Sequence, residues 1–192
     1  MSDNPNPQGK GQVPVLAALT ENQHATAAVP PKHIEQVSVE LFTSLFVLES
    51  DFSFKPVPGN TYWLYQKEGR FWLSPVPPQE WSPTVYGRYI GECQLQTDMS
   101  WTLMLAEDVA EDRAFLAYLE DKRARFEETL ESAETLDDAL PVHESRLPFY
   151  QRAFAYALAH SLGTSMERSG IRALSYNEAR GLLTHQPDSG DA

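Results

Sequence analysis

The chain has 192 residues and a formal net charge of −12, from 27 acidic and 15 basic residues. Its hydrophobic content of 42% is enough to build a buried core. The acidic balance argues against nucleic acid or an anionic membrane as the main partner, because both bind basic surfaces. The single cysteine excludes an internal disulfide framework and a cysteine-based zinc cluster. With no membrane-spanning apolar run and no secretory signal, the composition predicts a cytoplasmic protein.

Charge and aromatic content divide the chain into five predicted regions. Residues 1–31 and 185–192 are polar and lack aromatic side chains, so we expect them to be disordered tails. Residues 32–101 hold 13 of the 21 aromatic residues and predict an aromatic α+β core. Residues 102–140 carry 12 acidic and 4 basic residues and predict a long acidic helix, while residues 141–184 predict a helical C-terminal region. The expected fold class is α+β: a small three-stranded antiparallel meander packed against a first helix, followed by the acidic helix and C-terminal helices.

The first helix is predicted from about Lys32 to Ser50. Two prolines precede it, and apolar residues recur along it at helical spacing, namely Val37, Leu41, Leu45 and Leu48. This wide apolar stripe contains few charges, so we expect the rest of the fold to cover the helix well.

Three strands are predicted in the aromatic segment, where the apolar period changes from helical to alternating. The first two, Thr61–Gln66 and Arg70–Ser74, are separated by a short glycine-containing turn that predicts a hairpin. A proline-rich linker precedes the third strand, Val85–Gln96, in which Gly87 and Gly91 indicate bulges or points of close approach. The sequence therefore predicts an antiparallel meander with the first helix across one face.

Helices are predicted in the rest of the chain. Asp98 and Ser100 can cap a long helix of roughly 30 residues, whose apolar seam begins at Leu105 and continues to residue 140. If this seam is not buried within the chain, it can pair two copies into a homodimer through residues 105–140. A further helix is predicted from about Pro148 to Glu167, and a capping box of Ser175 and Glu178 predicts a last helix through Leu183.

The aromatic segment resembles an uncharacterised family of bacteria and eukaryotes, domain of unknown function twenty-four fifty-two. The resemblance covers about residues 52–101 and includes a Pro-Gly turn, a Tyr-x-Leu-Tyr strand, Leu-Ser, Glu-Trp and a final Asp-x-Ser-Trp. These motifs fall on Pro58, Gly59, Tyr62, Leu64, Tyr65, Leu73, Ser74, Glu80, Trp81, Asp98, Ser100 and Trp101. The resemblance implies a shared core and brings no activity with it.

The aromatic cluster supplies the candidate binding residues. Both faces of the predicted sheet carry aromatic side chains, so one face can pack on the first helix. The other face is either covered by the proline-rich linker or forms a groove for an extended ligand. The first hypothesis is a non-catalytic protein-binding or scaffolding protein that uses this surface and the acidic helix to contact a protein partner. Its expected contact residues are Tyr62, Trp63, Tyr65, Trp72, Trp81, Arg88 and Trp101.

The alternative hypothesis is a small hydrolase-like or other enzyme that uses carboxylates in an aromatic pocket. Its candidate groups are Glu80, Asp98 and His143. The common signatures for phosphate, dinucleotide, zinc and acyl-transfer sites are missing from the sequence, so no cofactor and no metal are expected. Cys93 lies on a predicted strand and is expected to be a small buried apolar residue.

Overall fold

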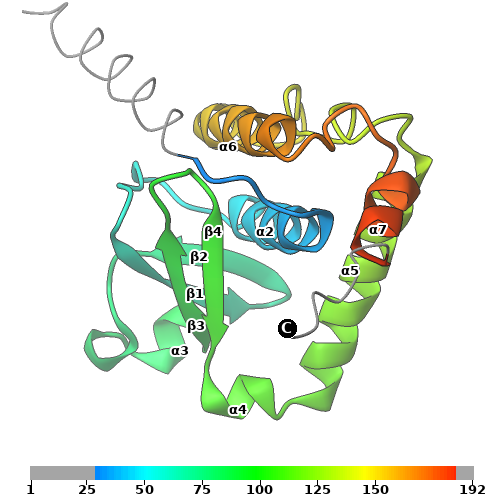
Figure 1. The fold of residues 1–192 in the computed structure, drawn as a ribbon. Helices are drawn as coiled ribbons and strands as arrows, with labels where there is room; N and C mark the ends of the chain where they lie inside the picture. Colours follow the sequence, from blue (N-terminus) through cyan, green and yellow to red (C-terminus); the bar gives the residue numbers. More distant parts are fainter. Residues whose placement is uncertain (1–28, 185–192) are drawn as a thin grey trace, which may run out of the picture.

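The computed structural model describes residues 29–184, and within them it confirms the α+β class. The longer helices all lie on one side of an antiparallel sheet (Figure 1). In chain order the elements are α2 (Ile34–Leu48), β1 (Thr61–Lys67), β2 (Arg70–Ser74), a 3₁₀ turn (Pro78–Glu80), α3 (Pro83–Tyr86), β3 (Arg88–Leu95), β4 (Trp101–Leu105), α4 (Glu107–Ala110), α5 (Arg113–Ser132), α6 (Phe149–Arg168) and α7 (Tyr176–Thr184).

The sheet has four strands in the order β2-β1-β3-β4, so the three-stranded meander was wrong in both number and order. The predicted hairpin is confirmed: Glu68 and Gly69 both have positive φ, as expected of a tight two-residue hairpin turn. However, β3 pairs with the other edge of β1 and not with β2. The connection at residues 75–87 forms the 3₁₀ turn and α3, and this length lets the chain pass over one face of the sheet before β3 begins.

The fourth strand occupies residues that were expected to begin the long helix. Trp101 is buried while Thr102 and Met104 are exposed, which is the alternation of a strand with one covered face. Asp98 and Ser100 do not cap a helix, since they lie in the turn between β3 and β4. There the Asp98 carboxylate accepts hydrogen bonds from the backbone N–H and the hydroxyl of Ser100, at 3.1 and 2.6 Å.

The single long acidic helix expected for residues 102–140 was also wrong, because the chain breaks near Asp112. Asp112 is the N-cap of α5 and accepts hydrogen bonds from the N–H groups of Ala114 and Phe115, which ends the short α4 and starts a new helix. α5 stops at Ser132, and residues 133–140 form turns that pack beside the approach to α7. The apolar residues whose spacing fitted one helix therefore belong to four different parts of the fold: β4, α4, α5 and the turns of residues 133–140.

α2 contributes to two separate apolar cores. Its C-terminal half packs with the sheet, including Leu64 and Trp101, and its N-terminal half packs with α5, α6 and α7. Figure 1 shows α2 between the sheet and these helices. The Ser44 hydroxyl accepts a hydrogen bond from the Trp101 backbone N–H at 2.8 Å and ties the helix to β4. The expectation of a well-covered first helix is confirmed.

The C-terminal helices agree with the sequence. α6 and α7 occupy the predicted segments, and Ser175 and Glu178 form the expected reciprocal capping box. Of the predicted N-terminal tail, residues 1–28 lie outside the described residues, as do residues 185–192. Val29 is buried, and the Pro30 carbonyl accepts a hydrogen bond from Ser165 of α6 at 2.6 Å. Between residues 29 and 184, no helix is long and apolar enough to cross a membrane.

Candidate binding groove

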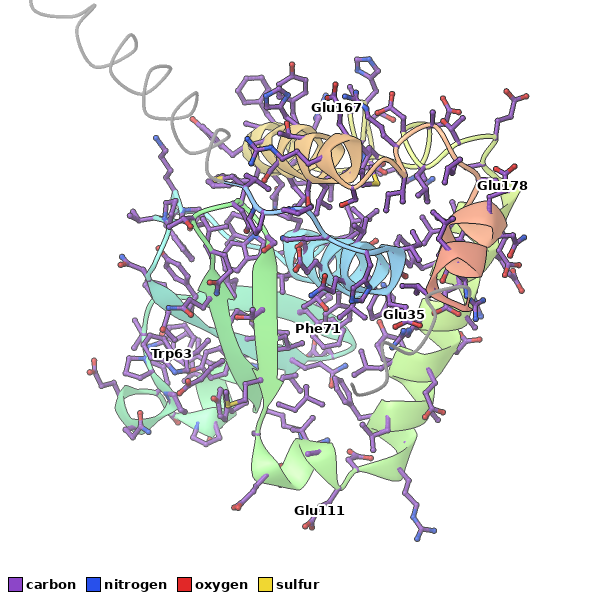
Figure 2. The ribbon with its side chains drawn as sticks, in the orientation of Figure 1. Glu35, Trp63, Phe71, Glu111, Glu167 and Glu178 are labelled. Atoms are coloured by element: carbon purple, nitrogen blue, oxygen red, sulfur yellow. The ribbon has the colours of Figure 1, made fainter. Side chains whose placement is uncertain are left out.

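The face of the sheet opposite α2 is largely covered by the proline-rich linker. Directly paired residues share a face, so Tyr65 and Trp72 lie together on the side away from α2. Figure 2 shows Trp63 on this same side and Phe71 on the side of α2. Trp81 stacks on Tyr65 with ring centroids 5.1 Å apart, and the Tyr65 hydroxyl donates to the Val76 carbonyl at 2.9 Å. Self-covering by the linker therefore accounts for much of this face.

The cover leaves an apolar groove of about 710 Å³ beside β2. We call it the aromatic groove; it is open to solvent and runs along the outer edge of the sheet. Its wall includes Trp72, whose indole N–H donates to the Tyr86 carbonyl at 3.3 Å, and Trp81, whose ring contacts that of Tyr86. The lining comes from four parts of the chain: residues 51–54, residues 72–76, Trp81 with Val85 and Tyr86, and Pro148 with Gln151.

The groove begins where two extended segments separate. Asp51 forms an isolated parallel bridge with β2: its N–H donates to the Phe71 carbonyl at 2.8 Å, and its carbonyl accepts from Leu73 N–H at 3.0 Å. Beyond this bridge the chain leaves the sheet, and Ser53 makes no hydrogen bond to any other described residue. Residues of both segments line the groove.

Few polar groups enter this apolar surface. Among the described lining residues Asp51 alone is charged; it is exposed and belongs to no ion pair of the described chain. Gln151 is only 3% exposed, and its amide nitrogen donates to the Ser50 carbonyl at 2.9 Å. Its side-chain oxygen accepts no hydrogen bond from residues 29–184. Both Asp51 and Gln151 also line a neighbouring hollow of about 480 Å³.

Of the expected binding residues, the structure brings Trp72 and Trp81 into the groove. Tyr62, Tyr65 and Trp101 are buried, with at most 5% exposure, and support the fold. Burial raises the pKa of Tyr65 to about 12. Trp63 lies on the outer face of the sheet but does not line the groove.

Arg88 has a structural role in this fold. Its guanidinium bonds to Asp112 and Asp108, and so joins the start of β3 to the corner between α4 and α5. Hydrogen bonding to Asp112 is the main reason that the pKa of Arg88 is raised. The same bond is the main reason that the pKa of Asp112 is lowered. Arg88 is not part of the groove lining.

Sequence reasoning missed several groove residues. Phe52 and Phe54 alternate along the chain before β1, and this period of two could have marked them as part of an extended segment. Tyr86 was assigned to a strand, although the structure places it at the end of α3. Asp51 and Gln151 carry no local signal, since their contribution depends on two segments 100 residues apart meeting in the fold.

The candidate catalytic groups do not converge. Glu80 lies in the 3₁₀ turn, His143 in the loop before α6 and Asp98 in the β3–β4 turn, and none lines the groove. Lys32 donates to Asp98 at 2.6 Å and also bonds to Glu40. Burial alone would raise the pKa of Asp98, but the bonds from Lys32 and Ser100 outweigh it, so the pKa is lowered.

No metal centre is formed by the described residues, in which no three His, Cys, Asp or Glu side chains gather to hold an ion. Cys93 is fully buried on β3, as expected from the sequence, and burial raises the pKa of its thiol far above the ordinary value. A thiol in this state is a packing element and a poor nucleophile.

Comparison with known proteins supports the sequence resemblance. No solved structure matches the chain significantly. The motif-based resemblance over about residues 52–101 falls inside a longer family match, which begins within α2, contains the whole sheet and ends within α5. Residues 43–121 of this chain match the model of the family described as Protein of unknown function (DUF2452).

Proposed function

We propose that this protein binds a segment of another protein in the aromatic groove and has no catalytic role. The observation that carries the proposal is the groove itself: an open, mainly apolar depression with Trp72, Trp81 and Tyr86 on one wall. Aromatic side chains supply large contact areas at a low cost in conformational entropy, and they are enriched among the residues that dominate binding energies. A protein segment fits an open groove along a sheet edge better than a small molecule does, because small-molecule sites bury most of their ligand.

The arrangement of charges favours binding over the enzymatic alternative. The enzymatic alternative requires carboxylates that lie together in an aromatic pocket, within hydrogen-bond reach of the reacting atoms. The groove contains a single carboxylate, Asp51, and the Asp98 carboxylate is already engaged by Lys32 and Ser100. The binding proposal requires neither a cofactor nor a metal. We place this binding role in the cytoplasm, the location that the composition favours.

The acidic region contributes at longer range. The apolar seam that would support a homodimer through residues 105–140 is partly used within the chain, where its members Val109, Leu130 and Leu140 are buried. The carboxylates of α5 that face solvent include Glu120, Glu128 and Glu131. They would attract a basic partner and raise its association rate, an effect that salt weakens. Sedimentation equilibrium tests self-association directly, since a dimer has twice the 21.6 kDa mass of the chain.

A display experiment with random linear peptides tests the proposal. The full-length protein is immobilised, and enriched peptides are then measured against the wild type, Trp81→Ala and Val85→Asp. Val85 is 56% exposed at the groove, so its substitution changes the lining with little effect on packing. Tyr156→Ala is the matched control, because Tyr156 is a 58% exposed aromatic residue on α6 outside the groove lining.

We expect binding to fall at least tenfold in both groove variants and to stay within twofold of wild type in the control. Circular dichroism melts establish that each variant is folded. The proposal is refuted if no peptide is enriched, or if the enriched peptides bind the groove variants as well as they bind the wild type.

A further inference from the structure

The hydrogen-bonding groups of the groove restrict what kind of segment can occupy it. After Leu73, the outer edge of β2 has few free backbone hydrogen-bonding groups with which an added peptide strand could pair. Pro75 has no N–H, the Val76 N–H donates to the Ser74 hydroxyl at 3.0 Å, and the Val76 carbonyl accepts from Tyr65. A peptide strand needs alternating donors and acceptors along the edge. This edge cannot supply them.

The groove instead presents donors beside aromatic faces. Within residues 29–184, neither the Trp81 indole N–H nor the Tyr86 hydroxyl takes part in a hydrogen bond, and the Ser53 N–H is also unused. A segment in the polyproline II conformation exposes its carbonyl oxygens as acceptors, and its proline residues have no N–H to satisfy. Aromatic grooves with a few donors bind such segments, because the segment is already ordered and loses little entropy.

Two lining residues offer side-chain acceptors, Asp51 and Gln151, and both also line the neighbouring hollow. The Asp51 carboxylate has no ion-pair partner in the described chain, and the buried Gln151 amide has an oxygen that accepts no hydrogen bond there. A guanidinium group offers several donors in one plane and can satisfy two acceptors together, which an ammonium group does less well. The overall charge of −12 also favours a cationic ligand.

We propose that the occupant of the aromatic groove is a proline-containing segment in the polyproline II conformation that carries an adjacent arginine. Its prolines pack on Trp72, Trp81 and Tyr86, their carbonyls accept from the free donors, and the arginine binds Asp51 and Gln151. This inference rests on the proposed function and names the chemistry of its ligand.

Fluorescence anisotropy with labelled synthetic peptides tests the ligand chemistry. The reference peptides are proline-rich dodecamers with one arginine at either end of the proline run, since the direction of binding is open. One series replaces the prolines by alanine, and another replaces the arginine by glutamine. Each peptide is titrated against the wild type, Asp51→Asn, Trp81→Ala and Glu120→Gln. The last variant removes one exposed carboxylate of α5, outside the groove lining, and controls for net charge.

We expect the arginine peptide to bind the wild type about twofold to fivefold more tightly than the glutamine peptide, the range for one exposed charge pair. Asp51→Asn should remove that preference, whereas Glu120→Gln should keep it. Alanine in place of proline should weaken binding at least threefold. Retention of the arginine preference in Asp51→Asn overturns the assigned cation site, and equal binding of the alanine series overturns the polyproline II assignment.

These failures are distinguishable from failure of the proposed function. If displayed peptides without proline or arginine bind in a manner that depends on Trp81, the groove is a binding site and the ligand chemistry inferred here is wrong. If no displayed or synthetic peptide depends on Trp81, both proposals fall together.

Discussion

Gly91 is a position in β3 at which a single added methyl group should disrupt the sheet. A Cβ atom built there would lie 2.2 Å from the Met104 carbonyl oxygen of β4 and 3.0 Å from the Leu105 Cα. Ordinary contacts require roughly 1 Å more, so Gly91→Ala must push β3 and β4 apart at the Gly91–Leu105 pair. The backbone atoms involved belong to two paired strands and cannot rotate away as a side chain can.

The expected cost is about 2–4 kcal/mol of unfolding free energy. Overpacking of this kind costs about 1–3 kcal/mol, and weakening a ladder hydrogen bond adds about 1 kcal/mol. For a chain of this size the melting temperature should fall by about 5–15 °C. Urea unfolding followed by circular dichroism gives the free energy, and a thermal scan gives the melting temperature.

Gly181→Ala is the matched control, because an added Cβ at this α7 position meets no atom within 4 Å. Alanine is the better helix former, so this variant should gain about 0.5–1 kcal/mol. Two variants with the same chemical change should therefore shift stability in opposite directions. A Gly91→Ala protein with an unfolding free energy within about 0.5 kcal/mol of wild type would refute the close approach of Gly91 to the Met104 carbonyl.

Three further predictions concern Cys93, Asp98 and Trp101. Cys93 should resist alkylation at pH 8 in the native protein and react on unfolding in urea; rapid labelling of native protein would contradict its burial. Asp98→Asn should be less stable than wild type at pH 6.5. Because the pKa of Asp98 is lowered in the folded state, its contribution is present above the unfolded pKa and is lost as the pH falls. The difference in urea midpoint between the two proteins should therefore shrink at pH 3, and an unchanged difference would contradict the Lys32 pairing. The Trp101 indole N–H is buried without a partner among the described residues, so Trp101→Phe should cost less than about 1 kcal/mol, against about 3–5 kcal/mol for Trp101→Ala. If chemical denaturation shows that Trp101→Phe loses as much unfolding free energy as Trp101→Ala, the prediction is wrong and the indole N–H has a hydrogen-bond partner.

Local sequence chemistry was sufficient for elements whose signals do not depend on distant residues. The β1–β2 hairpin follows from alternating aromatic residues around a Glu68-Gly69 turn, and α7 follows from the Ser175–Glu178 capping box. Such patterns act within a few residues, so tertiary contacts had no reason to override them.

Prediction failed where two periodicities fitted the same residues. Leu105 ends the alternating pattern of β4, yet it also starts a sequence of apolar residues at helical spacing. The turn chemistry of Asp98 and Ser100 suits a helix cap and a strand turn equally well. Only the pairing of Trp101 with Leu95 on β3 decides for the strand, and this contact cannot be read from local spacing.

Only some of the residues that line the groove could be predicted from the sequence. Trp72 and Trp81 stand out in the sequence because large aromatic side chains are rare. Their neighbours Tyr62 and Tyr65 stand out equally, but the register of β1 puts Tyr62 against the α2 side, and Trp81 covers Tyr65. Exposure therefore depends on sheet register and on the path of the linker, which composition does not encode.

The position of α2 in both cores has a consequence for the boundaries of the matched segment. A fragment limited to residues 43–121 would lose Ile34, Val37 and Leu41, together with Lys32, the partner of Asp98. It would also cut α5 before Leu130, although Phe46, Val47 and Leu48 of α2 would remain against the sheet. In this chain the matched segment therefore holds most of the core formed with the sheet, while much of the second core lies outside it. α2 contributes to both cores, so a fragment that begins at residue 43 divides a helix that the two cores share.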